Sequence, residues 1–193
     1  MAELVALGEM EAWTLKRLSL YRSSNDLGEG AMTSMLLSES RINELIAMPK
    51  TVVNKGARES KDGKVYRLEY RAVAQGFNEE FVVFVRRHVE MEENFTAGLR
   101  WIPKSGEPVI LMRCNGGSHP HTNQLERTSF SIGHCHVHVA TERYLTAGKN
   151  AEHYAETTED YHTHKGALHK LCQLCNIYGL DTGPDEPDMF GNG

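Results

Sequence analysis

The chain has 193 residues, of which 40% are hydrophobic and 24% are charged. This length and composition are typical of one globular domain with a core of ordinary size. The formal charge is −5, and much of it comes from four acidic residues between Asp181 and Gly193, where no basic residue occurs. The chain therefore lacks the net basic charge typical of a nucleic-acid-binding domain, although it can still carry a local basic patch.

The sequence predicts a cytoplasmic protein with reduced thiols. No apolar run is long enough to span a membrane, and the first residues lack the basic and then apolar segments of a signal peptide. Four cysteines are too few for a disulfide scaffold. Two of them, Cys172 and Cys175, have the spacing of half a zinc site. Both lie on the apolar side of an expected helix, which favours core packing over metal binding.

The N-terminal region is predicted to be helical. Residues 3–21 carry apolar side chains mostly three positions apart, which is the pattern of an amphipathic helix, and a flexible break follows at residues 23–30. We treat residues 1–35 as a helical segment that packs on the domain, contacts a protein partner or supports a homo-oligomer. A second helix is expected to begin near Ser38 and to end before Pro49, since the residue preceding a proline is disfavoured in helical geometry.

The residues after this helix predict an antiparallel meander of about five strands. Asp62-Gly63 is typical of a hairpin turn, and Val65–Ala74 alternates between apolar and charged side chains. Four further strands are expected, at residues 81–88, 97–102, 108–113 and 134–141.

A C-terminal helix is expected from about Lys165 to Tyr178, because apolar side chains recur there at helical spacing. Together with the meander it predicts an α+β domain over residues 36–180. Residues 181–193, which are acidic and contain two prolines, are expected to form a disordered tail.

Histidines are concentrated in the second half of the chain, where nine of the ten lie from position 119 onward. Three of them, His134, His136 and His138, alternate with small apolar residues. On a strand, all three project from one face. Alternate residues on a strand are about 6.6 Å apart, and zinc–nitrogen bonds are about 2.0 to 2.1 Å. Two neighbouring histidines can therefore share one metal ion, but three can do so only with difficulty.

A long loop at residues 115–133 precedes the histidine strand and can cover the same face. His119 and His121 in this loop are the natural additional ligands if His136 and His138 bind a divalent metal such as Zn or Mn. Without a metal, the two loop histidines are expected to bind the substrate.

The segment His134–Ala140 has the pattern His-apolar-His-apolar-His-apolar-apolar, and Ser131 lies three residues before it. This pattern resembles the signature of the histidine-triad nucleotide hydrolases and transferases. The resemblance implies that His136 is a nucleophile that attacks phosphorus, with His134 and His138 supporting it as catalytic residues.

The resemblance is confined to this strand and to the serine before it. Phe130 stands where the family has a glutamine, and residues 141–144 stand where it has a glycine pair and a tryptophan. Asn115-Gly116 lies far upstream of the position of the family's asparagine–glycine element.

The function expected from these residues is hydrolysis of a phosphodiester or nucleotide, as in a small nuclease or toxin-like ribonuclease. One histidine acts as the base and another as the acid. Arg113, Asn115 and Ser131 are expected to bind the substrate, with Arg113 or Lys149 near the phosphate. Two alternatives remain open. One is a non-enzymatic bacterial or phage binding or regulatory protein with incidental histidines, and the other is a His-x-His metal-binding protein.

Overall fold

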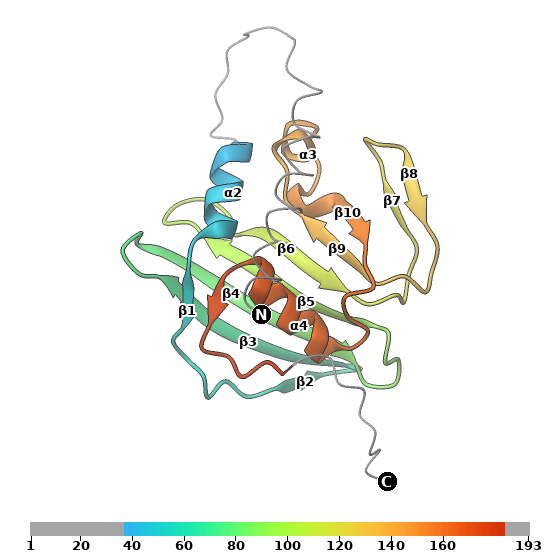
Figure 1. Cartoon of the computed structure of the whole chain (residues 1–193), viewed down its shortest axis with the longest axis horizontal. Helices are drawn as coiled ribbons and strands as arrows, with labels where there is room; N and C mark the ends of the chain where they lie inside the picture. The colour runs from blue at the N-terminus through green and yellow to red at the C-terminus, as the bar shows by residue number, and fades with distance from the viewer. Residues whose placement is uncertain (1–36, 184–193) are drawn as a thin grey trace, which may run out of the picture. The chain divides into compact units, whose positions relative to one another are not determined.

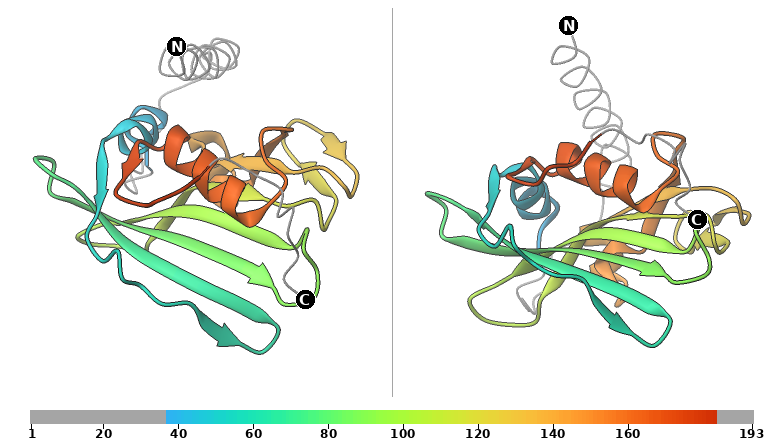
Figure 2. Two further views of the ribbon diagram at one scale, coloured as in Figure 1. Left: turned by 60° about the horizontal axis from the view of Figure 1, so that its bottom comes forward. Right: turned by 90° about the horizontal axis from the view of Figure 1, so that it is seen from below.

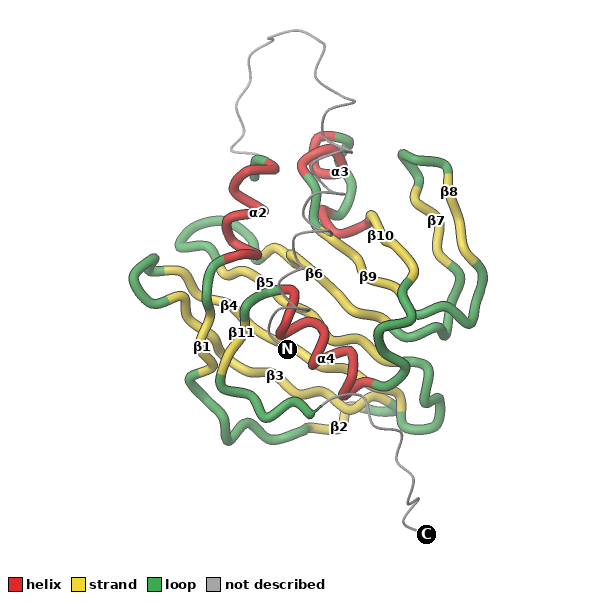
Figure 3. Tube along the Cα trace, in the orientation of Figure 1, coloured by secondary structure: helices red, strands yellow, loops and turns green. Residues whose placement is uncertain are grey.

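The computed structural model of the protein describes residues 37–183. A nine-stranded sheet of mixed orientation and three α-helices make up this part of the chain, which confirms the expected α+β class (Figures 1 and 3). The helices are α2 (Glu39–Ala47), α3 (Glu142–Thr146) and α4 (His164–Leu174), with a short 3₁₀ helix, η1 (Ala151–His153). The expected helix at residues 3–21 and the tail after residue 183 lie outside the described residues.

The main sheet has the strand order β10-β9-β6-β5-β4-β3-β1-β11, with β2 paired to β3. Its strands are β1 (Lys50–Val52), β2 (Ser60–Asp62), β3 (Val65–Ala74), β4 (Glu79–His88), β5 (Phe95–Ile102), β6 (Val109–Asn115), β9 (His136–Val139), β10 (Tyr154–Thr157) and β11 (Ile177–Tyr178). The expectation of a five-stranded meander was wrong. The five expected strands are neighbours in the sheet, but β1, β2, β10 and β11 extend it and β1 pairs with β11 in parallel. These four strands have only two to four residues each, too few to show a strand pattern.

One face of the sheet forms the core with α4. Alternation along the strands places Val83, Leu99 and Met112 on this face, and all three are fully buried. The thiol of Cys175, which directly follows α4, contacts the sulfur of Met112 at 3.5 Å. Figure 2 shows α4 lying across this face, where it packs on β4, β5 and β6. Side chains one position along each strand therefore belong to the opposite face.

The two long helices begin and end at identifiable residues. The Ser38 side chain accepts a hydrogen bond from the Arg41 backbone N–H, which caps the start of α2, and the helix stops before Pro49 as expected. The Thr163 hydroxyl caps α4 in the same way. The expected end of this helix at Tyr178 was wrong, because Asn176 adopts a left-handed conformation with φ of 50° and the chain continues as β11.

Lys50 joins the C-terminal ends of α2 and α4. Its side chain is completely buried, and its ammonium group donates hydrogen bonds to the backbone oxygens of Ile46, Met48 and Cys175 at 2.7 to 2.9 Å. Helix ends leave such carbonyls without partners inside the helix. Burial lowers the pKa of Lys50 to about 8, which still leaves it mainly protonated at neutral pH.

The loop at residues 115–133 contains a hairpin of two short strands, β7 (His121–Asn123) and β8 (Thr128–Phe130). The Asn123 side chain ties this hairpin to β10. Its oxygen accepts from the Ala155 N–H and its amide nitrogen donates to the Ala155 oxygen, both at 2.8 Å. This pair of bonds reproduces the contacts of a neighbouring strand and fixes β7 beside β10, which is paired with the histidine strand β9.

Candidate functional site: a histidine cluster between the sheet and the β7–β8 hairpin

Five histidine rings contact one another on the face of the sheet opposite α4, and we call them the histidine cluster. They come from β9, from β7 and the residues before it, and from η1: His119, His121, His136, His138 and His153. The ring centroids of His136 and His138 are 4.9 Å apart. His121 lies 4.8 Å from His138, and His119 lies 5.2 Å from His136. The expectation that the loop brings histidines to the strand is therefore confirmed.

The register of β6 and β9 determines which side chains accompany the cluster. Arg113 lies directly opposite His138, and Asn115 lies directly opposite His136. Directly opposed residues project to the same face of an antiparallel pair. Arg113 and Asn115, both expected to bind substrate, thus lie beside the two strand histidines.

His136 and His138 are neutral, and the position of their hydrogens follows from their partners. The Nδ1 atom of His136 bonds to the His134 backbone oxygen at 3.0 Å, and the Nδ1 atom of His138 bonds to the Glu152 backbone oxygen at 2.9 Å. A carbonyl oxygen only accepts, so both Nδ1 atoms donate and both Nε2 atoms carry a lone pair. Burial lowers the pKa of His136 to about 4 and, with the nearby charge of Arg113, that of His138 to about 2.

His121 differs from His136 and His138 in that its Nε2 atom, rather than only its Nδ1 atom, faces a hydrogen-bond acceptor. The Oδ1 atom of Asn123 is fixed as an acceptor by the Ala155 N–H, so the Nε2 atom of His121, 3.1 Å from it, is a donor. Burial lowers the pKa of His121, while its bonds to Asn123 and to the His153 backbone oppose that lowering. His121 is also more exposed than His136 and His138. It can therefore carry a second proton more readily than they can.

Buried polar atoms without hydrogen-bond partners gather at this site. Six such side-chain atoms occur among the described residues: Arg100 Nε, Arg113 Nε, Asn115 Oδ1, His138 Nε2, Thr141 Oγ1 and His153 Nε2. Four of them belong to the cluster or to its two neighbours on β6. Buried polar groups are normally paired, and unpaired ones are found where a ligand, a water molecule or a catalytic step uses them.

Arg113 is the positive charge of the site. Its guanidinium lies 3.6 Å from the Glu152 carboxylate, a longer separation than in a close ion pair. Burial lowers its pKa, Glu152 opposes this, and the nearby Arg86 adds to it. Arg113 is thus half-buried, loosely paired and next to a neutral imidazole, an arrangement suited to an incoming anion.

Three expected site residues are not brought into the cluster. The strand begins at His136 rather than at 134, and His134 precedes it as an exposed residue. Its backbone oxygen orients His136, but within the described residues its ring makes no contact with another aromatic or histidine ring. Ser131 is exposed in the segment after β8. Lys149 bonds to Gln124 on the outer part of the hairpin.

Sequence reasoning missed three residues of the site. His153 contacts the ring of His121, Glu152 supplies partners to both His138 and Arg113, and Phe130 packs on His121 and His136. Glu152 and His153 follow the histidine strand through a short helix and a turn, and no motif marks them. Phe130 could have been recognised as a site residue, because it is the apolar residue of the short strand β8 that follows the loop histidines.

The geometry for a metal ion is absent from the part of the chain that the structure describes. No three His, Cys, Asp or Glu side chains in residues 37–183 are arranged to hold one. The alternative set of His119, His121, His136 and His138 is assembled, but as rings in contact rather than as converging ligands. Cys172 and Cys175 are both buried without a disulfide, as expected for core residues.

The described residues therefore define an α+β protein with a cluster of histidines beside an arginine. A family model described as "Family of unknown function (DUF6978)" matches residues 37–177. Because this match spans most of the chain, the protein belongs to that family. No curated protein and no solved structure matches the chain. None of the described helices has the length and apolar character needed to cross a membrane.

Proposed function

We propose that the protein cleaves phosphodiester bonds by histidine acid–base chemistry, with RNA or a nucleotide as the substrate. One observation carries the proposal: His136, whose Nε2 lone pair has only a long 3.5 Å contact with the Asn115 side-chain amide, lies beside His121, whose Nε2 carries hydrogen, and close to Arg113. A neutral base, a proton donor and a cation are the three groups that phosphodiester transfer needs.

In the ribonuclease version, Nε2 of His136 takes the proton of a ribose 2′-hydroxyl. The 2′-oxygen then forms a bond to phosphorus while the bond from phosphorus to the 5′-oxygen breaks. Protonated His121, whose ring centroid lies 5.9 Å from that of His136, gives a proton to the leaving 5′-oxygen. Arg113 balances the charge that develops on the phosphoryl oxygens. The products are a 2′,3′-cyclic phosphate and a free 5′-hydroxyl, and His136 ends protonated.

Two side chains cover the base. His136 is fully buried, with Phe130 and the exposed His119 packed against its ring. Rotation of the His119 side chain away from His136 is therefore part of the proposal, because the reacting oxygen must approach Nε2 within hydrogen-bond distance.

The test compares His136→Gln with His134→Gln in the full-length protein, on RNA oligonucleotides and on nucleotides. We expect His136→Gln to reduce the cleavage rate by about a hundredfold or more and His134→Gln to leave it nearly unchanged. Thermal unfolding of both variants checks that they fold, and His121→Asn gives a second, less buried substitution. Wild-type protein inactive on every substrate overturns the proposal and favours the non-enzymatic binding protein.

The same pair of variants separates acid–base chemistry from the histidine-triad mechanism. In that mechanism His136 attacks phosphorus, a phosphorus–nitrogen bond forms and the bond from phosphorus to the leaving group breaks. A covalent nucleotidyl-protein intermediate therefore accumulates when the acceptor reacts slowly. A requirement for the His134 side chain, together with a labelled intermediate, favours the triad. Neither is expected for the acid–base version.

We further propose that the protein acts in the cytoplasm. No disulfide joins the four cysteines, all of which lie within residues 37–183, and three of them are buried. Such thiols suit a reducing compartment.

A further inference from the structure

The sheet face that carries the histidine cluster also carries a continuous row of polar side chains. Successive register pairs join Arg67 to Arg86, Arg86 to Thr96, Thr96 to Asn115 and Asn115 to His136. These five residues, which we call the arginine row, cross β3, β4, β5, β6 and β9. Neighbouring strands are about 4.8 Å apart. The row therefore runs from the exposed Arg67 and Arg86 to His136, the proposed base, with about that spacing between successive residues.

The first pair of the row brings two like charges together. Arg67 and Arg86 lie directly opposite each other on β3 and β4, and both are exposed. Like charges in this position disfavour the sheet. Arg67 pairs with Asp62 at 2.8 Å. The Arg86 side chain forms no hydrogen bond or ion pair with any residue in the range 37–183, which leaves its charge open to a ligand.

A second row holds the guanidinium groups in place. Phe84 lies opposite Gly98, and Gly98 lies opposite Arg113. Because glycine has no side chain, the Phe84 ring lies over it, and a Cβ atom there would come within 2.3 Å of the ring. The guanidiniums of Arg86 and Arg100 lie 5.2 and 5.8 Å from the centre of this ring. Stacking on an aromatic ring orders an arginine without using its hydrogen-bond donors.

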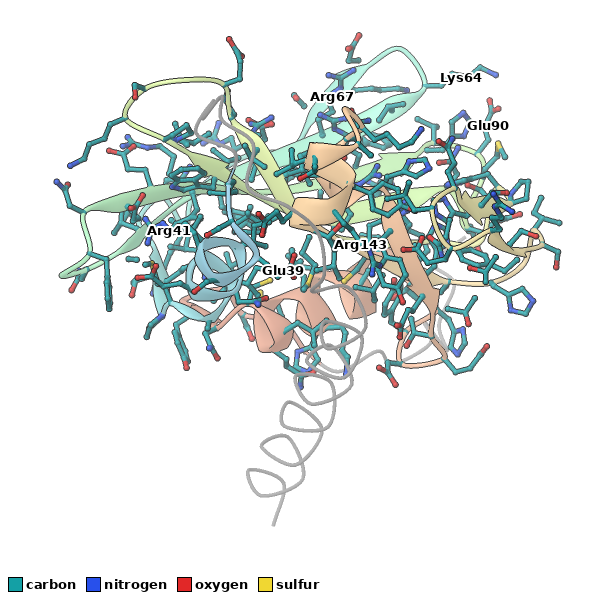
Figure 4. The ribbon with its side chains drawn as sticks, turned by 90° about the horizontal axis from the view of Figure 1, so that it is seen from above. Glu39, Arg41, Lys64, Arg67, Glu90 and Arg143 are labelled. Carbon is teal, nitrogen blue, oxygen red and sulfur yellow. The ribbon has the colours of Figure 1, made fainter. Side chains whose placement is uncertain are left out.

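The charge of this face contrasts with that of the whole chain. Its strand residues include five arginines (Arg67, Arg71, Arg86, Arg100 and Arg113) and three carboxylates (Asp62, Glu69 and Glu80). The protein as a whole has a formal charge of −5. Both glutamates pair with arginines of the face, at 3.2 Å for Glu69 and 3.9 Å for Glu80. Figure 4 shows Arg67 on the side of the sheet away from α4. An excess of guanidinium groups on one face is complementary to a chain of phosphates.

We propose that this face binds a single-stranded polynucleotide, whose phosphates follow the arginine row and deliver one phosphodiester to His136. The inference rests on the proposed function and names its substrate as a strand rather than a mononucleotide. Exposed, ordered guanidinium planes suit unpaired bases, which stack on arginine as well as on aromatic rings. RNA and DNA share the phosphates that the arginines would bind, but only RNA has the 2′-hydroxyl that the proposed cleavage step uses, and the experiment distinguishes them.

Binding is measured by fluorescence anisotropy with labelled strands of about 12 nucleotides, as RNA, as DNA of the same sequence and as the duplex. The protein carries His136→Gln, so that cleavage does not disturb the equilibrium. Arg86→Gln is the main variant, since this side chain has no partner to lose except the Phe84 ring. Lys165→Gln is the matched control, because Lys165 is an exposed cation on α4, over the opposite face. Circular dichroism checks that each variant is folded.

We expect Arg86→Gln to weaken single-strand binding about five- to tenfold. The slope of the logarithm of the binding constant against the logarithm of the salt concentration is expected to become shallower by about 0.7 for each lost phosphate contact. Lys165→Gln is expected to change affinity less than about twofold. Equal effects of the two variants, preference for the duplex, or no salt-dependent binding overturns the inference. Stronger binding of RNA than of DNA identifies RNA as the strand.

The two proposals fail in different ways. If the wild-type protein cleaves nothing but binds single strands through Arg86, only the proposed function fails. If it cleaves a dinucleotide while Arg86→Gln binds longer strands as well as its parent does, only the present inference fails.

Discussion

Glu39 and Glu142 cap each other's helices. The backbone N–H of Glu39 donates to the Oε2 atom of Glu142 at 2.8 Å, and the backbone N–H of Glu142 donates to the Oε2 atom of Glu39 at 2.9 Å. These are the first residues of α2 and α3, where backbone N–H groups lack partners within the helix and where negative charge is stabilising. Since α3 leads into η1, which holds His138 through Glu152, this contact links α2 to the histidine cluster.

The first prediction concerns this reciprocal cap. Glu142→Ala is expected to lower the free energy of unfolding by about 1 to 2 kcal/mol, because it leaves the Glu39 N–H without its acceptor. In a double-mutant cycle with Glu39→Ala, the two losses are expected to be non-additive by about 0.5 kcal/mol or more. Urea unfolding measures both quantities. Glu92→Ala, an exposed control, is expected to change stability by less than about 0.5 kcal/mol. Strict additivity would contradict a direct coupling.

The second prediction is a loss of stability in mild acid. The pKa values of His136 and His138, about 4 and about 2, lie below the value of about 6.5 for an unfolded chain. Below pH 6.5 the unfolded chain therefore binds protons that the folded protein does not. Stability present above pH 6.5 is lost as the pH falls toward 4 for His136 and toward 2 for His138, by about 2 kcal/mol per histidine at pH 5 relative to pH 7.

Urea unfolding at pH 7 and pH 5 tests this linkage. The His138→Gln variant is expected to lose less stability between the two pH values than the wild type does, by about 2 kcal/mol. Identical losses in the two proteins would mean that His138 does not stay neutral in the fold.

The third prediction is an acidic optimum for the proposed cleavage. The base, His136, is active above its pKa of about 4, whereas the acid, His121, is active below a pKa that is lowered from 6.5. The rate is therefore expected to peak between about pH 4 and about pH 6.5 and to fall on both sides. His121→Asn should remove the alkaline side of the profile. An optimum above pH 7 would reject these assignments.

The fourth prediction tests the close approach of Phe84 and Gly98. A Cβ atom at Gly98 would come within 2.3 Å of the Phe84 ring, so Gly98→Ala is expected to destabilise the protein by about 1 to 3 kcal/mol. Phe84→Leu in the same chain should recover part of this loss. At Gly56 no heavy atom lies within 4 Å of an added Cβ atom, and Gly56→Ala serves as the control. Thermal unfolding gives the comparison, and equal effects at the two glycines would argue against the contact.

The long elements were predictable because they repeat a pattern over many residues. The alternation in Val65–Ala74 gave β3 with its observed bounds, and Ser38 and Pro49 marked the ends of α2. The short strands β1 and β11 were not predictable, since they pair with each other although they lie far apart in the chain. The helix α4 ends at Leu174, and Asn176 shortly after it adopts a left-handed conformation that the apolar spacing does not reveal.

The site was predictable only in part. The alternating histidines identified the face, and the loop supplied His119 and His121 as expected. His134 was misjudged as a strand residue, because β9 begins after it. The contributions of Glu152 and His153 depend on how η1 returns to β6, a tertiary contact that leaves no periodic signal in the sequence.

The parallel pairing of β1 with β11 has a consequence for synthesis of the protein on the ribosome. Lys50 lies in register with Ile177, and its ammonium group bonds to an oxygen 125 residues further along the chain. Until that segment leaves the exit tunnel, one edge of the sheet is unpaired and a lysine destined for the interior lacks one of its acceptors. The domain is therefore expected to reach its native state only after translation has passed the last strand, with slow closure typical of contacts between distant residues.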